Sequence, residues 1–310
     1  MHHFFSKISI VLTSLVTTSL LLVSIMLSSC GSKDVATAKE DASVASGSTL
    51  KLVKKWETDS TLTTSESVIL DEKAGLLYVA CIGGVPPDSK DGDGFIAQVA
   101  IYGNIVEDKW VTGLDAPKGM GIFADTLYVA DITDVVRINR KTGEIIDRIA
   151  IEDAAFLNDI TTDEAGHVFV SDTRANRIHK ITNGNSEVWL EDTDMGGPNG
   201  LYVEANRLMV ATFGSGNFGS VDLETKKFDS HSVDIPSGDG IVKLTNGYLV
   251  SNWNGEVYHV NNHWQQTRLL DTKGVNVNAA DIALLPSKNM LLVPTFFKNS
   301  VVAYEIQDEM

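Results

Sequence analysis

The sequence has little positive charge, few cysteines and no apolar residues at a convincing helical spacing. Its 25 Lys and Arg residues are outnumbered by 41 Asp and Glu, which gives a net charge of −16. So acidic a chain is a poor partner for nucleic acid or for a bare anionic membrane. The lack of helical periodicity favours an all-β protein. Of the two cysteines, Cys81 lies within an apolar stretch and is expected to be a small core residue.

The first 29 residues have the features of an export signal. Lys7 precedes an apolar run from Ile8 to Leu27 that is interrupted only by Ser and Thr. The run ends at Leu27-Ser28-Ser29-Cys30, which resembles the lipobox of bacterial lipoproteins. We therefore expect cleavage before Cys30 and a lipid on that residue. The alternative is an uncleaved membrane helix, because the apolar run is nearly long enough to span a bilayer.

A polar segment follows Cys30 and continues to residue 49. It is rich in Ser, Ala, Lys, Asp and Glu, so it buries too little apolar surface to offset the entropy of ordering. We interpret 1–29 as a signal peptide and 30–49 as the lipidated Cys and a flexible tether, which places the protein at the cell envelope. A lipidated Cys30 would leave Cys81 without an intramolecular disulfide partner.

One short strand signal recurs six times in the remainder of the chain. The copies end 40 to 50 residues apart, and the longest interval contains a Gly/Pro/Asp-rich insertion from Gly83 to Gly94. Four short strands per repeat of about 40 residues are typical of propeller blades. The copies are Leu77–Cys81, Leu127–Asp131, Val168–Asp172, Leu208–Thr212, Tyr248–Asn252 and Leu291–Thr295.

Residues 50–310 are therefore predicted to form a six-bladed β-propeller with four-stranded blades. A seventh blade would need about 40 more residues, and a β-helix would need shorter, more uniform coils. The last repeat stops after Ser300–Ile306, one strand short. The segment Leu50–Trp56 is expected to supply the missing outer strand and so close the ring.

A column of residues lies 13 to 15 positions before the recurring strand ends. These positions start the innermost strands, which border the channel of a propeller. In a closed ring their side chains converge on one axis, although they are far apart in sequence. The six residues are Glu66, Lys118, Asn158, Asn199, Asp239 and Ala280.

Four members of this column carry oxygen ligands. Two carboxylates, Glu66 and Asp239, and two amides, Asn158 and Asn199, suit a hard divalent cation such as Ca²⁺. The alternative is structural, because Asn-Gly and Asp-Gly pairs are ordinary turn signals. Asp281, next to Ala280, is a weaker candidate for a second, deeper cation.

The same pieces of sequence carry a family resemblance. Ser65-Glu66-Ser67-Val68, Leu157-Asn158-Asp159, Pro198-Asn199-Gly200-Leu201 and Gly238-Asp239-Gly240-Ile241 resemble the senescence marker protein (regucalcin) and gluconolactonase family. Its relatives include diisopropyl fluorophosphatase and paraoxonase. The resemblance implies a six-bladed propeller that binds calcium through Glu, Asn and Asp residues of successive inner strands. It covers all blades except the second and the sixth.

Two departures set this chain apart from that family. Members that cleave sugar lactones often have an Arg two residues before the first Asn, where this chain has Phe156. Lys118 also projects toward the channel where the family has no ligand. The segment Val170–Ile178 equally resembles NHL-type repeats, many of which only bind partners.

The predicted site suggests a role for each residue. Asp239 is the candidate catalytic carboxylate, acting as a general base on water or attacking directly. Lys118 either holds a substrate carboxylate or phosphate, or pairs with Glu66 or Asp239 and replaces the cation. Phe156, Phe213 and Trp253 either line an apolar substrate pocket or simply pack between blades.

Two functions compete on this evidence. The first is a metal-dependent hydrolase of the gluconolactonase type that acts on a lactone or related ester. The second is a non-catalytic, NHL-like propeller that binds a protein or glycan partner at the cell envelope. We expect a monomer that touches the membrane only through its lipid. Fold alone does not decide between the two functions, because propellers serve both.

Overall fold

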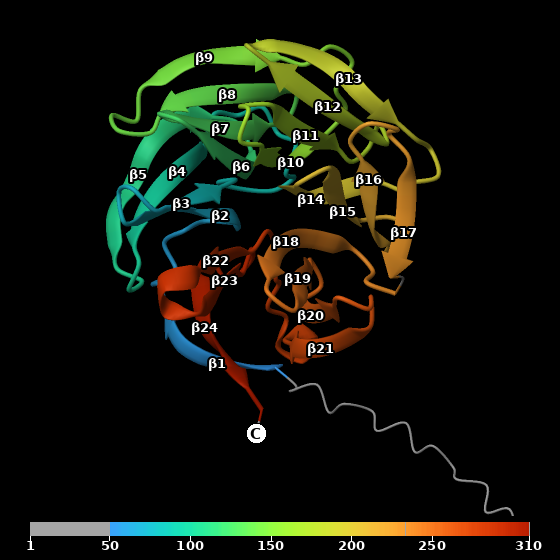
Figure 1. Ribbon diagram of the computed structural model, residues 1–310. Helices are drawn as coiled ribbons and strands as arrows, with labels where there is room; N and C mark the ends of the chain where they lie inside the picture. The colour runs from blue at the N-terminus through green and yellow to red at the C-terminus, as the bar shows by residue number, and fades with distance from the viewer. Residues whose placement is uncertain (1–49, 233, 310) are drawn as a thin grey trace, which may run out of the picture. The chain divides into compact units, whose positions relative to one another are not determined.

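Six sheets of four antiparallel strands are arranged around a central axis, as Figure 1 shows. The computed structural model describes residues 50–232 and 234–309, and the predicted signal peptide, Cys30 and tether lie outside these residues. Within the described ranges the helices are two short 3-10 turns, η1 (Lys273–Val275) and η2 (Pro286–Lys288). None of the described helices could cross a bilayer. The predicted all-β, six-bladed propeller is confirmed.

The first three blades follow one another along the chain, and each begins with its innermost strand. Blade 1 contains β2 (Ser65–Asp71), β3 (Leu76–Cys81), β4 (Gly94–Ala100) and β5 (Ile105–Leu114). Blade 2 contains β6 (Pro117–Phe123), β7 (Thr126–Asp131), β8 (Asp134–Asn139) and β9 (Ile145–Ala150). Blade 3 contains β10 (Leu157–Thr162), β11 (Val168–Asp172), β12 (Arg177–Thr182) and β13 (Asn185–Glu191).

The last three blades continue this order and then close the ring. Blade 4 contains β14 (Pro198–Glu204), β15 (Arg207–Thr212), β16 (Phe218–Asp222) and β17 (Phe228–Ser232). Blade 5 contains β18 (Gly238–Leu244), β19 (Gly247–Asn252), β20 (Glu256–Asn261) and β21 (Gln266–Asp271). Blade 6 contains β22 (Ala283–Leu285), β23 (Met290–Pro294), β24 (Val301–Asp308) and β1 (Leu50–Glu57).

Ring closure by the N-terminal strand is confirmed. β1 pairs antiparallel with β24 from Leu50 opposite Asp308 to Glu57 opposite Val302. Pairing of the two ends of the propeller leaves β24 without an exposed edge and ties the first strand of the propeller to its last. One apolar cluster also joins blade 6 to blade 1, and it includes the buried side chain of Cys81.

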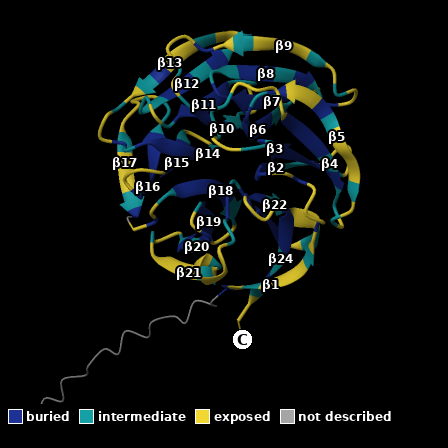
Figure 2. Cartoon of the chain, turned by 180° about the vertical axis from the view of Figure 1, so that it is seen from behind, coloured by how far each residue is buried: buried dark blue, intermediate teal, exposed yellow. Residues whose placement is uncertain are grey.

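The second strand of each blade explains why the repeat was visible in the sequence. All six residues of β19 are buried, as are the last five of β3. A strand in the middle of a blade packs against the neighbouring blades with both faces, so it is apolar throughout instead of alternating. The outer strands are partly exposed, and Figure 2 shows this gradient from a buried centre to an exposed rim.

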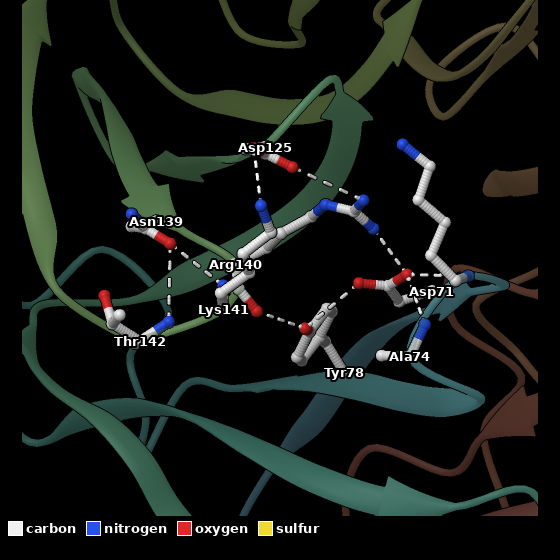
Figure 3. A network of polar contacts seen from close by, with 9 residues as sticks. Asp71, Ala74, Tyr78, Asp125, Asn139, Arg140, Lys141 and Thr142 are labelled. Carbon is white, nitrogen blue, oxygen red and sulfur yellow. Dashed lines mark hydrogen bonds and ion pairs between the residues drawn. The ribbon is translucent and has the colours of Figure 1, made fainter.

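A buried polar cluster links blade 1 to blade 2 (Figure 3). Arg140, which follows β8, forms an ion pair with Asp71 at the end of β2, and the two side chains are only 5% and 2% exposed. The Tyr78 hydroxyl lies 2.7 Å from the Arg140 carbonyl oxygen and 3.2 Å from Asp71 Oδ2. The backbone N–H groups of Lys73 and Ala74 also donate to Asp71 Oδ1, each at 3.0 Å. This cluster fixes the end of the inner strand that carries Glu66.

Candidate functional site

The predicted column occupies one structural position in five blades. Glu66, Lys118, Asn158, Asn199 and Asp239 are each the second residue of an innermost strand, and Ala280 lies three residues before β22. In all five strands the pairing with the next strand shifts register at this point. Such a bulge bends the strand and redirects a side chain. The shared bulge therefore explains why these side chains leave the blade and face the channel.

Glycines after three of these positions allow the blades to approach closely. A Cβ atom at Gly200 would lie only 1.7 Å from the backbone oxygen of Asp239, and one at Gly240 would lie 2.3 Å from the backbone nitrogen of Ile282. Any side chain there would push neighbouring inner strands apart. The sequence Asn-Gly or Asp-Gly thus serves close packing at the axis as well as the local bend.

The two channel amides are oriented by hydrogen bonds from their nitrogen atoms. Asn158 Nδ2 donates to Thr173 Oγ1 at 3.3 Å, and Asn199 Nδ2 donates to the Gly238 carbonyl oxygen at 3.1 Å. The oxygen of each amide is therefore the end left for another partner. Asn199 is 2% exposed, and its Oδ1 has no hydrogen-bond partner among the described residues.

The carboxylates of the column are buried and repel their neighbours. Glu66 is 5% exposed, and its Oε2 atom also lacks a partner among the described residues. Burial and the charge of Asp281 raise the pKa of Glu66 to about 8. Burial and the charges of Glu66 and Asp281 likewise raise the pKa of Asp239 well above its usual range. A cation would relieve both the repulsion and the loss of hydration.

Two further carboxylates, Asp159 and Asp281, lie one position deeper in the channel. Asp159 accepts hydrogen bonds at 2.6 Å from the backbone N–H groups of Ile160 and Leu201. Asp281 accepts one at 2.5 Å from the Ser67 hydroxyl, and burial raises the pKa of Asp281 to about 7. The sequence analysis assigned no role to Asp159, because its contact with Leu201 in the next blade is visible only in the structure.

Below these carboxylates a ring of apolar side chains narrows the channel. Each is the fourth residue of its blade's inner segment and is at most 5% exposed. A cavity of about 410 Å³ lies on this side, with Asp159 and Asp281 among its lining residues. The ring lines this cavity together with the two deeper carboxylates. It consists of Val68, Met120, Ile160, Leu201, Ile241 and Ile282.

Lys118 does not form the predicted ion pair with the channel carboxylates. Its Nζ atom donates to the Ala116 carbonyl oxygen at 2.9 Å and lies 4.5 Å from the centre of the Phe156 ring. Within the described residues, no carboxylate lies within 4.0 Å of it. Burial lowers the pKa of Lys118 to about 8, although the charge of Glu66 opposes the change. The structure therefore does not support the alternative in which Lys118 replaces a cation by direct pairing.

The three predicted aromatic residues come from different blades and have different neighbours. Phe156, before β10, contacts the cations of Lys118 and Arg174. Phe213, after β15, is 40% exposed. Trp253, after β19, packs edge-on against Phe296 at 5.4 Å between ring centroids. Only Trp253 thus packs in the manner expected for contacts between blades.

Acidic residues at two strand ends position the segments that lead into the channel. Asp131 accepts hydrogen bonds from the backbone N–H groups of Asp115 and Ala116, which precede β6. Asp172 does the same for Ala155 and Phe156, before β10, at 2.9 Å each. These contacts to turn backbone fix the approach to Lys118 and Asn158.

The side chains of the column suit a cation that binds carboxylate and amide oxygens together, and they do not form a metal site of acidic, His and Cys residues alone. In the described part of the chain, no group of three or more His, Cys, Asp or Glu side chains is arranged to hold a metal. The column instead offers two carboxylates and two oriented amides, of which Glu66 and Asn199 present buried oxygens without partners. Such mixed oxygen ligands suit Ca²⁺.

Comparisons with solved structures show the fold. A catalytically inactive virginiamycin B lyase from Staphylococcus aureus with quinupristin has a TM-score of 0.59 at 12% identity, covering 83% of this chain and 99% of its own. A streptogramin B lyase has a TM-score of 0.60 at 13% identity over 84% and 98%. A "putative gluconolactonase" has a TM-score of 0.65 at 12% identity over 84% and 93%.

These likenesses support a gluconolactonase-like propeller fold at low sequence identity. No protein-family model and no curated protein matches the sequence. The structural neighbours include a lyase and a gluconolactonase-like protein, so this fold occurs in propeller enzymes.

Proposed function

We propose that the channel binds a divalent cation, Ca²⁺, through Glu66, Asn158, Asn199 and Asp239, and that the protein hydrolyses a lactone or related ester there. The observation that carries the proposal is the pair of buried, unpartnered oxygens, Glu66 Oε2 and Asn199 Oδ1, on blades 1 and 4. Leaving such atoms without a partner costs free energy unless a ligand satisfies them. The raised pKa values of Glu66 and Asp239 favour the same conclusion.

The residues around the channel suit hydrolysis. A bound cation would polarise the ester carbonyl group and stabilise the negative charge that forms on it. Asp239 would take a proton from the attacking water or attack the carbonyl carbon itself. The hydrogen bonds from Asn158 to Thr173 and from Asn199 to Gly238 hold the two amide oxygens in fixed directions. The enzymes among the structural neighbours support an enzyme as the general class.

The test is hydrolysis of a panel of lactones and phosphotriesters by calcium-loaded protein. We expect Asp239→Asn to lower kcat by about 10² to 10⁴ with the fold intact, the usual range for removal of a general base. Asp229→Asn is the matched control, because Asp229 lies on the outer strand β17 with a side chain that is 56% exposed. Wild-type turnover by Asp239→Asn would exclude the assignment.

A second candidate is a propeller that binds a partner without catalysis. Phe213 and Phe297 favour it, because they follow β15 and β23 with 40% and 54% of their surfaces exposed. Absence of turnover on the whole panel, together with a tight protein or glycan partner recovered by pull-down, would support this candidate over the hydrolase. Substitution of both residues by Ser would then abolish recovery of the partner.

The proposed location is the cell envelope, with a lipid on Cys30. The sequence Leu27-Ser28-Ser29-Cys30 supports this proposal.

A further inference from the structure

The insertion in blade 1 reaches across the propeller to blade 3. Residues 82–93 connect β3 to β4, and the Asp88 carboxylate there lies 2.7 Å from Arg174 Nη1, in the turn after β11. On the way the loop crosses blade 2, where Lys90 Nζ donates to Thr133 Oγ1 at 3.0 Å. The loop therefore reaches the turns after β7 and β11, and the Gly92 N–H group also donates to Asp115 Oδ1, before β6, at 3.1 Å.

Two cations meet at one aromatic ring beneath this loop. Lys118 Nζ lies 4.5 Å from the centre of the Phe156 ring, and the Arg174 guanidinium carbon lies 4.3 Å from it. Two like charges on one ring repel each other unless an anion is near. Asp88 provides that anion, and its charge acts on both Arg174 and Lys118.

Lys118 has more donor capacity than the protein uses. Its side chain is 1% exposed, and its one hydrogen bond among the described residues is to the Ala116 carbonyl oxygen. An ammonium group carries three donors, so a buried one with a single acceptor can still bind an oxyanion. Lys118 occupies the blade-2 position of the column that also holds the proposed metal ligands.

We propose that Lys118 and Arg174 form a subsite for a carboxylate or phosphate group of the substrate, and that Asp88 occupies the Arg174 side of this subsite until the substrate displaces it. Asp88 is thus an internal carboxylate that imitates the substrate anion, and the loop at 82–93 covers the subsite. The role of the subsite in turnover rests on the proposed function. Its anion binding rests on the contacts of these three side chains.

Calorimetric titration tests the subsite without any turnover. Inorganic phosphate and acetate are titrated separately at constant ionic strength into protein freed of metal on a chelating resin. Asp88→Asn removes the internal competitor and is expected to tighten binding of the favoured anion about fivefold, the upper range for a partly exposed ion pair. If only phosphate binds more tightly to Asp88→Asn, the subsite takes a phosphate group. If only acetate binds more tightly, the subsite takes a carboxylate group.

Matched variants separate the subsite from general electrostatics. Asp91→Asn removes the same charge from the same loop, and no cation of the described residues lies within 4.0 Å of Asp91, so this variant should bind like the wild type. Arg174→Met, at a side chain that is 53% exposed, should abolish the gain in the Asp88→Asn background. The proposal would be overturned if Asp88→Asn and Asp91→Asn bind the anion with equal affinity. It would also be overturned if the gain in anion affinity persists when Arg174→Met is added to Asp88→Asn.

A kinetic comparison then connects the subsite to the channel. With calcium present, Lys118→Met should lower kcat/KM about tenfold more for a lactone that carries a carboxylate or phosphate than for a neutral lactone. An equal loss on both substrates would overturn the assignment of Lys118. If no lactone is turned over while the calorimetric results hold, the proposed hydrolase fails and the anion subsite stands.

Discussion

Removal of the buried Arg140 guanidinium group between blades 1 and 2 should destabilise the propeller strongly. Arg140→Met deletes the guanidinium group that pairs with Asp71, and both side chains are almost fully buried. Breaking such a pair from one side costs about 3 to 5 kcal/mol, because a buried charge is left behind. Asp71 keeps the hydrogen bonds from Lys73, Ala74 and Tyr78, so we expect a loss near the lower limit, about 3 kcal/mol.

Equilibrium unfolding in urea measures this loss directly. Lys141→Met is the control, because Lys141 pairs with Asp125 at a site where the side chains are 66% and 58% exposed, and an exposed pair contributes at most about 1 kcal/mol. In a thermal scan, about 3 kcal/mol corresponds to a fall in Tm of roughly 6 to 12 °C for a domain of this size. If Arg140→Met costs no more than Lys141→Met, the buried pair does not hold blade 1 to blade 2.

Two further changes test the axis and the anchor. Gly200→Ala places a Cβ atom against the Asp239 backbone, so it should lower the free energy of unfolding in urea by about 3 kcal/mol and weaken calcium binding. Gly274→Ala, with open space around it, should change neither quantity. A Gly200→Ala protein with unchanged affinity for calcium would contradict the close approach of blades 4 and 5. Cys30→Ser should move the protein from the membrane fraction to the soluble fraction and prevent labelling with fatty acid, and continued labelling would rule out Cys30 as the modified residue.

The fold was predictable because one physical feature repeats. Segments such as Leu77–Cys81 are buried on both faces, so their continuous apolar character marks each blade in the sequence. The closing strand at Leu50 was predictable from the missing strand of blade 6. The near-constant spacing of the blades also placed Glu66, Asn199 and Asp239 at equivalent positions of the inner strands.

The rest of the channel depends on contacts that sequence spacing does not encode. Asp159 directly follows Asn158 and resembles a turn residue in one sequence, yet its carboxylate bonds to the next blade at Leu201. Lys118 could equally have paired with a carboxylate, and only the three-dimensional structure shows that it faces Phe156. The contact of Asp88 with Arg174 spans three blades, and an insertion without a repeat counterpart gives no register to predict it.

A crystal structure of the protein grown with Ca²⁺ tests the central claim most directly. The account predicts one cation on the channel axis, with oxygens of Glu66, Asn158, Asn199 and Asp239 at about 2.3 to 2.6 Å, the range for calcium–oxygen bonds. A channel that stays free of metal at saturating Ca²⁺, or a cation bound to other residues, would contradict it.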